Sequence, residues 1–190
     1  MSALAPLDYR YALDAAMTLL TPHGPALVRC DVPVLVDEIL QRFPTRTKID
    51  PSSGLWVEPL NDTWQATLDH FAAELPAQAR LVIIASRPLA CLLPERRGWE
   101  KKPLGLRLRG LAQFRPALRR TGFVLEASYG IHTLTSISLN VVGQQLSRLD
   151  QPDLADRLGF AARLRYCTTG SAAALATVAL LVARKEARRC

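Results

Sequence analysis

Cysteine and histidine, the residue types that most often ligate metals, are few and scattered along this chain of 190 residues. They are Cys30, Cys91, Cys167, Cys190, His23, His70 and His132. The chain has no Cys-x-x-Cys pair and no cluster that combines cysteine with histidine. We therefore predict neither a zinc site nor a framework of disulfide bonds.

Ser86 is the serine best placed to act as a nucleophile, because it ends the continuous, β-branched strand predicted at residues 81–86. It is followed by Arg87 and Pro88 rather than by a turn into a helix, and the chain has no Gly-x-Ser-x-Gly motif. A phosphate-binding loop of the Gly-x-x-x-x-Gly-Lys type is also absent from the sequence. Neither serine-hydrolase chemistry nor phosphate-loop chemistry is predicted.

A turn without glycine, Cys30-Asp31-Val32-Pro33, follows the first predicted strand at residues 26–30. In α/β folds that bind nucleotides, glycines at this turn let the backbone approach the ligand, because glycine has no Cβ. Here Val32 and Pro33 place side-chain atoms in the turn, and Pro33 also removes a backbone N–H donor. We expect the turn to hinder the close approach of a nucleotide-like ligand.

Positive charge is concentrated between residues 95 and 120 in a chain whose formal net charge is +7. The basic residues of this segment are Arg96, Arg97, Lys101, Lys102, Arg107, Arg109, Arg115, Arg119 and Arg120. Such a run is typical of a solvated surface. It is also compatible with contact to nucleic acid, an anionic surface or an acidic partner, made first through Arg96, Arg97, Lys101 and Lys102.

Strands and helices alternate along the chain, which predicts an α/β fold with a mostly parallel sheet between two layers of helices. Apolar runs predict strands at residues 26–30, 45–50, 55–58, 81–86, 123–127 and 177–183. The last strand follows a long connection without a simple crossover helix, so we expect it to pair antiparallel at an edge of the sheet. We predict a single domain over residues 1–190.

Two neighbouring helical segments, about residues 137–149 and 153–165, interrupt the alternation before the last strand. The turn between them is Asp150-Gln151-Pro152. Nearer the start, apolar residues at helical spacing predict an amphipathic helix over residues 8–20, and a further helix begins near Asn61 and carries Trp64 and Leu68 on one face.

Two short motifs in the second half of the chain resemble a known family. A helix ends in Leu118-x-x-x-Gly122-Phe123 before a strand, and the last strand ends in Ala183-Arg184-Lys185. Both are similar to the closing elements of Rossmann-like S-adenosylmethionine-dependent methyltransferases, and residues 64–84 are similar to the helix that leads into the fifth strand of that family. The resemblance implies a Rossmann-like three-layer sandwich. The short interval between Cys30 and Leu81 implies that it is shortened between strands 2 and 4.

The resemblance also implies where S-adenosylmethionine would lie. Asp50 matches the acidic residue with which the family binds the cofactor's ribose, although an Asp before Pro51-Ser52-Ser53 is equally suited to form a turn. Asp31 would lie beside the cofactor as well. Trp56, Glu58 and Asn61 would lie near the transferred methyl group.

Three functions are open at this stage. The first is a methyltransferase-like protein that has lost normal cofactor binding and acts as a non-catalytic module for a protein partner or a second copy of itself. The second is an active S-adenosylmethionine-dependent methyltransferase with an atypical cofactor site. The third is nucleic-acid binding through the basic face at residues 96–120. No apolar run is long enough to span a bilayer and the N-terminus has no export signal, so a cytoplasmic protein is expected.

Overall fold

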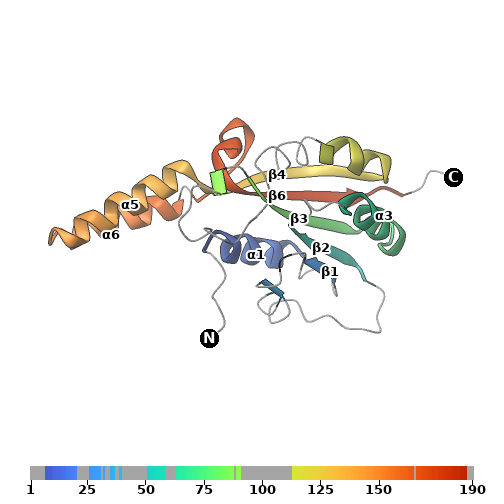
Figure 1. The fold of residues 1–190 in the computed structure, drawn as a ribbon, viewed down its shortest axis with the longest axis horizontal. Helices are drawn as coiled ribbons and strands as arrows, with labels where there is room; N and C mark the ends of the chain where they lie inside the picture. The colour runs from blue at the N-terminus through green and yellow to red at the C-terminus, as the bar shows by residue number, and fades with distance from the viewer. Residues whose placement is uncertain are drawn as a thin grey trace.

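A mixed sheet of six strands forms the centre of the structure, and helices pack on both of its faces (Figure 1). This is the three-layer α/β arrangement that the alternation of strands and helices predicts. The computed structural model describes residues 7–20, 26–30, 32, 35–36, 39, 51–58, 63–87, 89–90, 113–164 and 166–187.

The strands follow the order β1-β2-β3-β6-β4-β5 across the sheet. Their bounds are β1 (Ala26–Cys30), β2 (Ser53–Val57), β3 (Arg80–Ser86), β4 (Phe123–Thr133), β5 (Cys167–Thr168) and β6 (Ala176–Lys185). The pairs β1–β2 and β2–β3 are parallel, whereas β6 is antiparallel to both β3 and β4. β1 to β4 therefore all run in one direction, as the predicted mostly parallel sheet requires.

The C-terminal strand β6 is antiparallel, as predicted, but the expectation that it lies at an edge of the sheet is wrong. It lies in the interior, between β3 and β4. Residues 176–183 of this strand are buried without interruption, so both of its faces are covered. An apolar strand of this kind suits an interior position, where both rows of backbone groups are paired, and the two-residue strand β5 takes the place beyond β4 instead.

The first strand pairs directly with β2, with Val28 opposite Leu55. The strand predicted at residues 45–50 lies outside the described residues, as does most of the connection from β1 to β2. Leu35 and Ile39 are among the described residues of that connection, and both are buried against the same face of the sheet as α1 (Leu7–Leu20).

Alternate residues of each strand point to opposite faces of the sheet and divide the interior into two apolar cores. On one face Val82 and Ile84 pack against α1. On the other face Leu81 and Ile83 pack against α3 (Trp64–Glu74) and against a helix at residues 113–120. The near-continuous apolar run of β3 is explained by these two cores, because both of its faces are covered.

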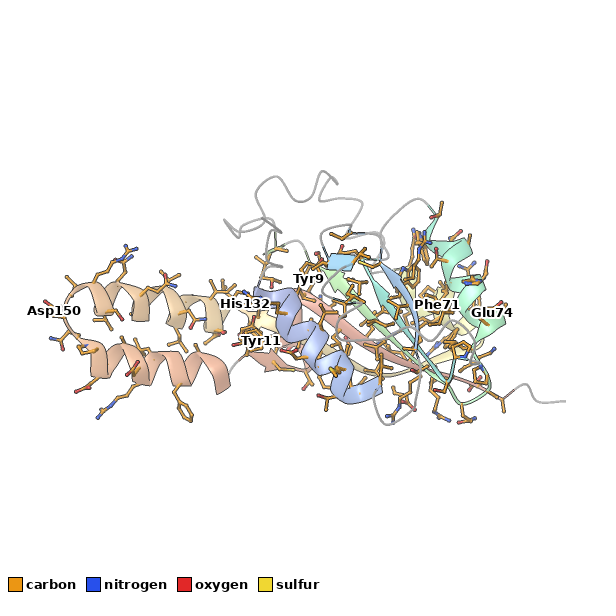
Figure 2. All side chains as sticks on the ribbon, turned by 90° about the horizontal axis from the view of Figure 1, so that it is seen from below. Tyr9, Tyr11, Phe71, Glu74, His132 and Asp150 are labelled. Carbon is orange, nitrogen blue, oxygen red and sulfur yellow. The ribbon has the colours of Figure 1, made fainter. Side chains whose placement is uncertain are left out.

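The predicted helical pair is confirmed as an antiparallel hairpin of α5 (Leu134–Arg148) and α6 (Pro152–Leu164). Thr133 caps α5, since its side chain accepts a hydrogen bond from the Ser136 N–H at 3.2 Å. Asp150 turns the chain with a φ of 57° and marks the tip of the hairpin, which projects well beyond the sheet (Figure 2). A short 3-10 helix, η4 (Gly170–Leu175), leads from β5 into β6.

Within the described segments, every helix is too short or too polar to cross a lipid bilayer.

Candidate functional site

One buried acidic residue, Glu58, lies at the carboxyl ends of the parallel strands β2 and β3. Open α/β sheets bind ligands at this end of their strands. The Glu58 N–H donates to the Ile84 carbonyl at 2.8 Å, which continues the pairing of the two strands by one residue. The φ of Glu58 is 57°, in the left-handed region that non-glycine residues rarely adopt. At this position the regular alternation of the strand therefore ends.

The Glu58 side chain enters a cluster with Tyr9 and Ser86. Its Oε1 atom accepts hydrogen bonds from the Ser86 N–H at 2.6 Å, from the Ser86 hydroxyl at 2.6 Å and from the Tyr9 hydroxyl. The Tyr9 and Ser86 hydroxyl oxygens lie 2.8 Å apart. Only 6% of Glu58 is exposed, and Tyr9 and Ser86 are fully buried. The cluster joins α1 to the ends of two strands and keeps the carboxylate away from solvent.

The turn after β1 brings another side chain to this end of the sheet. Val32 packs against the core beneath α1, and its carbonyl accepts hydrogen bonds from the Cys30 thiol at 3.3 Å and from the Leu35 N–H at 3.0 Å. The turn is thus closed by its own backbone, and a β-branched side chain points from it into the protein.

Arg87 places a positive charge directly after Ser86. Its N–H donates to the Thr177 carbonyl at 2.7 Å and so ties the end of β3 to the start of β6. Burial lowers the pKa of the Arg87 guanidinium below its usual range. Its Nε atom is buried and makes no hydrogen bond to any of the described residues.

The structure separates the residues that the resemblance grouped around a cofactor. Trp56 is fully buried in the core under α3, with its ring 5.7 Å from the rings of Phe71 and Phe114. It therefore does not share a site with Glu58, which contacts Tyr9 of α1 on the other side of the sheet. Asp31, Asp50 and Asn61 lie outside the described residues, so their predicted roles remain predictions.

The basic segment also lies mostly outside the described part of the chain. Its last residues, Arg115, Arg119 and Arg120, are exposed on the helix at residues 113–120. The predicted contacts through Arg96, Arg97, Lys101 and Lys102 fall on residues that the structure does not describe.

Sequence reasoning missed the participation of Tyr9. The sequence pattern places Tyr9 within the amphipathic helix predicted over residues 8–20, and it indicates Ser86 only as a possible nucleophile. A tyrosine on the buried face of a helix was the available signal, because a buried phenol hydroxyl normally finds a hydrogen-bond partner. Its partner is 49 residues away in the sequence, so the sequence pattern could not identify it.

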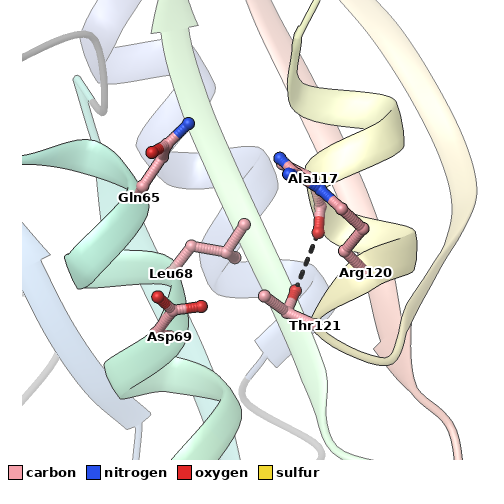
Figure 3. A pocket seen from close by; sticks show the side chains of 6 residues that line it. All are labelled: Gln65, Leu68, Asp69, Ala117, Arg120 and Thr121. Atoms are coloured by element: carbon pink, nitrogen blue, oxygen red, sulfur yellow. Dashed lines mark hydrogen bonds between the residues drawn. The ribbon is translucent and has the colours of Figure 1, made fainter.

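Among the described residues, two cavities are lined in part by residues of α3 and lie apart from the Glu58 cluster. The first, of about 190 Å³, opens between α3 and the helix at residues 113–120 (Figure 3). There the Thr121 hydroxyl donates to the Ala117 carbonyl at 3.1 Å. The second, of about 430 Å³, shares Asp69, Arg120 and Thr121 with the first and extends to Lys185. Glu58 lines neither cavity.

No protein-family model and no curated protein matches this chain. Several solved structures are similar to it. One is a chain of the complex between the Haloferax volcanii Trm112 methyltransferase activator and a proposed methyltransferase, with a TM-score of 0.46, 12% identity, and coverage of 94% of this chain and 80% of that chain. Another is geranyl diphosphate C-methyltransferase from Streptomyces coelicolor A3(2), with a TM-score of 0.42, 12% identity, and coverage of 97% of this chain and 85% of that chain.

A third similar structure is the plantazolicin methyltransferase BpumL in complex with SAH, with a TM-score of 0.45, 8% identity, and coverage of 95% of this chain and 85% of that chain. These are methyltransferase structures, the family that the sequence resembles. Their TM-scores lie below 0.5 and their identities are low. A functional assignment therefore has to rest on the residues of this chain.

Proposed function

We propose that this chain is a methyltransferase-like module that does not bind S-adenosylmethionine in the ordinary way and acts by presenting a surface to a protein partner. The observation that carries this proposal is the buried cluster of Tyr9, Glu58 and Ser86. It occupies the strand ends where an α/β fold would receive a small ligand. The one acidic side chain described there is turned inward and already hydrogen-bonded within the protein.

The turn after β1 supports the same proposal. A cofactor that approached this turn closely would meet the side chain of Val32, which is packed against the core beneath α1. Glycine allows such an approach because it lacks a Cβ, and the sequence has no glycine between Gly24 and Gly54. The described residues at these strand ends therefore do not fit S-adenosylmethionine.

Opening the cluster to admit a ligand is energetically unfavourable. A buried acceptor that loses its donors is destabilised by about 1–3 kcal/mol, and more when it is charged. A ligand that used Glu58 would have to replace the Tyr9 and Ser86 hydroxyls with donors of its own. This argues for a structural role of Glu58, in which it fixes α1 against β2 and β3.

Calorimetric titration of the full chain with S-adenosylmethionine and with S-adenosylhomocysteine tests the proposal. We expect no heat of binding up to millimolar ligand, with an active methyltransferase titrated under the same conditions as the positive control. Circular dichroism of the same sample shows that the protein is folded. Micromolar binding of either compound would overturn the proposal.

An active methyltransferase is the second candidate, and one observation favours it. Glu58, a member of the cluster, has a strained backbone with a φ in the left-handed region. Residues held in sparsely populated backbone conformations concentrate at functional sites. If the titration shows micromolar binding, Glu58→Gln should weaken it, because the substitution removes the charge at the strand ends. The matched control is Glu74→Gln on the exposed surface of α3, which should leave the affinity unchanged.

A further inference from the structure

The hairpin of α5 and α6 carries most of the exposed apolar surface of the described protein. Among the residues that the structure describes, ten large apolar side chains are exposed, and six of them belong to residues 134–164. The six are Leu134, Val141, Val142, Leu149, Leu154 and Phe160. The hairpin projects away from the sheet, so the body of the same molecule does not cover them (Figure 1). A concentration of exposed apolar residues on a projecting element marks an interaction surface.

The inner face of α5 is identified by its small residues. Ser136 and Gly143 are buried there, and a Cβ added to Gly143 would lie 3.4 Å from the Ala155 carbonyl oxygen and 3.7 Å from the Leu158 Cβ. These positions therefore face α6. At about 100° per residue, the opposite face of α5 holds seven exposed residues. They are Leu134, Ser138, Val141, Val142, Gln145, Arg148 and Leu149, the last of which caps the helix.

Apart from its arginine, this outer face shows the same order of apolar and polar residues from either end along the helix axis. About a point midway between Val141 and Val142, Leu134 is the counterpart of Leu149 and Ser138 is the counterpart of Gln145. When two copies of a helix lie antiparallel about a two-fold axis, each residue meets its counterpart in the other copy. Such a pairing places leucine against leucine, valine against valine and polar against polar.

We propose that the outer face of α5 binds a second copy of the same chain, with the two helices antiparallel and the two-fold axis between Val141 and Val142. The interface is self-complementary, as a closed dimer requires. The two valines form its centre and are half exposed in the single chain, at 52% and 50%. The leucines at both ends extend the apolar contact along the whole helix.

The distribution of charge favours a second copy over an anionic partner. Arg148 is the one charged residue of α5. Over residues 134–164, Arg148, Arg157 and Arg163 balance Asp150, Asp153 and Asp156, although the whole chain has a net charge of +7. A hairpin without net charge does not attract nucleic acid or an anionic membrane, and it does not repel a second copy of itself.

This proposal rests on the proposed function in one respect, because it names the partner of the surface-presenting module. The two are tested by separate measurements. Self-association is measured by sedimentation without any cofactor, and cofactor binding is measured by calorimetry on the same preparation, so either idea can fail alone.

Sedimentation of the full chain over a wide concentration range is the first test. We expect a reversible monomer–dimer equilibrium, and we expect Val141→Glu/Val142→Glu to remain monomeric. Leu175→Glu is the matched control, because Leu175 is 55% exposed on η4, outside the hairpin, and its substitution should leave the dimer intact. Circular dichroism confirms the fold of each variant. A monomeric wild type, or a folded double variant that still dimerises, overturns the proposal.

A charge pair tests the antiparallel register. In Leu134→Lys/Leu149→Glu, each introduced lysine should meet an introduced glutamate of the other copy, whereas in Leu134→Glu/Leu149→Glu only like charges meet. Since exposed ion pairs and like-charge contacts each change affinity modestly, we expect the first variant to dimerise about tenfold more tightly than the second. Equal affinities, or tighter association of the second variant, contradict the antiparallel register.

Discussion

At Glu58, a carboxylate is buried because donors from two other elements surround one of its oxygens. The left-handed backbone at this residue ends the alternation of β2, and the carboxylate is bonded beneath α1 instead of packing beside Trp56. The carboxylate that the resemblance places near a transferred methyl group therefore joins α1 to the ends of β2 and β3. This interpretation predicts that the Tyr9 and Ser86 hydroxyls make coupled contributions to the free energy of unfolding.

Tyr9→Phe and Ser86→Ala test that coupling. Each substitution removes a hydroxyl from a buried acceptor and should lower the free energy of unfolding by about 1–3 kcal/mol. Since both hydroxyls serve the same oxygen, the double variant should deviate from additivity by about 0.5 kcal/mol or more. Denaturant unfolding of the four proteins measures this. Strict additivity would show that the two residues do not share Glu58.

Gly130 is a residue of β4 at which backbone and side chains approach closely. A Cβ added there would lie 2.7 Å from the Ala173 Cα and 2.8 Å from the Ala173 carbonyl oxygen. Because backbone atoms cannot move aside cheaply, Gly130→Ala should destabilise the protein by about 1–3 kcal/mol. Thermal unfolding measures the change.

Gly159→Ala is the matched control for that prediction. Gly159 lies within α6, and a Cβ added there meets nothing within 4 Å. Alanine is the better helix former, so this variant should gain about 0.5–1 kcal/mol. If Gly130→Ala is equally well tolerated, η4 does not pack on β4 as described.

Among the elements, α3 is fixed at its C-terminal end by the last residue of β6. The Lys185 ammonium donates to the carbonyls of Ala72 and Leu75, which would otherwise be unpaired groups at the end of the helix. The neighbouring Arg184 guanidinium donates to the Glu126 carboxylate at 2.5 Å, and the Arg80 guanidinium lies 3.5 Å from the same carboxylate. Glu126 therefore pairs with two arginines that lie on the adjacent strands β3 and β6.

Lys185→Met should therefore weaken α3 in particular. The substitution keeps the length of the side chain and removes the charge that interacts with the helix end. We expect a loss of about 0.5–1 kcal/mol, given that Lys185 is partly exposed. Hydrogen exchange over residues 64–75 should accelerate, whereas Arg119→Met on the exposed helix surface should leave it unchanged. Unaltered exchange in α3 would argue against the cap.

The hairpin is attached to the body by a stack of rings at its base. The His132 ring lies 5.0 Å from the Tyr166 ring with 9° between their planes, and the ring of Tyr11, a residue of α1, lies 4.1 Å from the Tyr166 ring. The His132 N–H also donates to the Tyr166 carbonyl at 2.8 Å. Figure 2 shows Tyr11 and His132 at this junction and Asp150 at the opposite end.

Tyr166→Leu should loosen the attachment while it keeps much of the buried volume. Stacked aromatic pairs contribute about 0.5–1.5 kcal/mol beyond their buried area, so we expect a loss of that size. Hydrogen exchange at the start of α5 and the end of α6 should increase more than exchange in β3. A uniform increase across the protein would show that the stack does not specifically hold the hairpin.

What the sequence could predict is local. The strand at residues 81–86 and the helical pair around Asp150 were predicted because apolar periodicity and turn residues are read from neighbouring positions. The interior place of β6, the inward turn of Glu58 and the cap from Lys185 depend on contacts between distant residues. In each case a partner from another element decides the outcome, and a single sequence does not show that partner.

At the scale of the whole molecule, two apolar cores share one sheet, and a hairpin with an uncovered apolar face extends from it. We propose that residues 1–190 form one domain on this basis. The strand ends, where a ligand would be expected, are closed by Tyr9, Glu58, Ser86 and Val32. The exposed apolar residues lie mainly on the hairpin, which begins at the end of β4 on the same side of the sheet as these strand ends. This arrangement supports our proposal that the protein binds a macromolecule and does not turn over a small one.

A crystal structure of the chain grown with saturating S-adenosylhomocysteine tests this account most directly. The account predicts no ligand density at the carboxyl ends of β1 and β2, and an unchanged Tyr9–Glu58–Ser86 cluster. Density for the compound beside Val32, with Glu58 or Tyr9 displaced to receive it, would contradict the account.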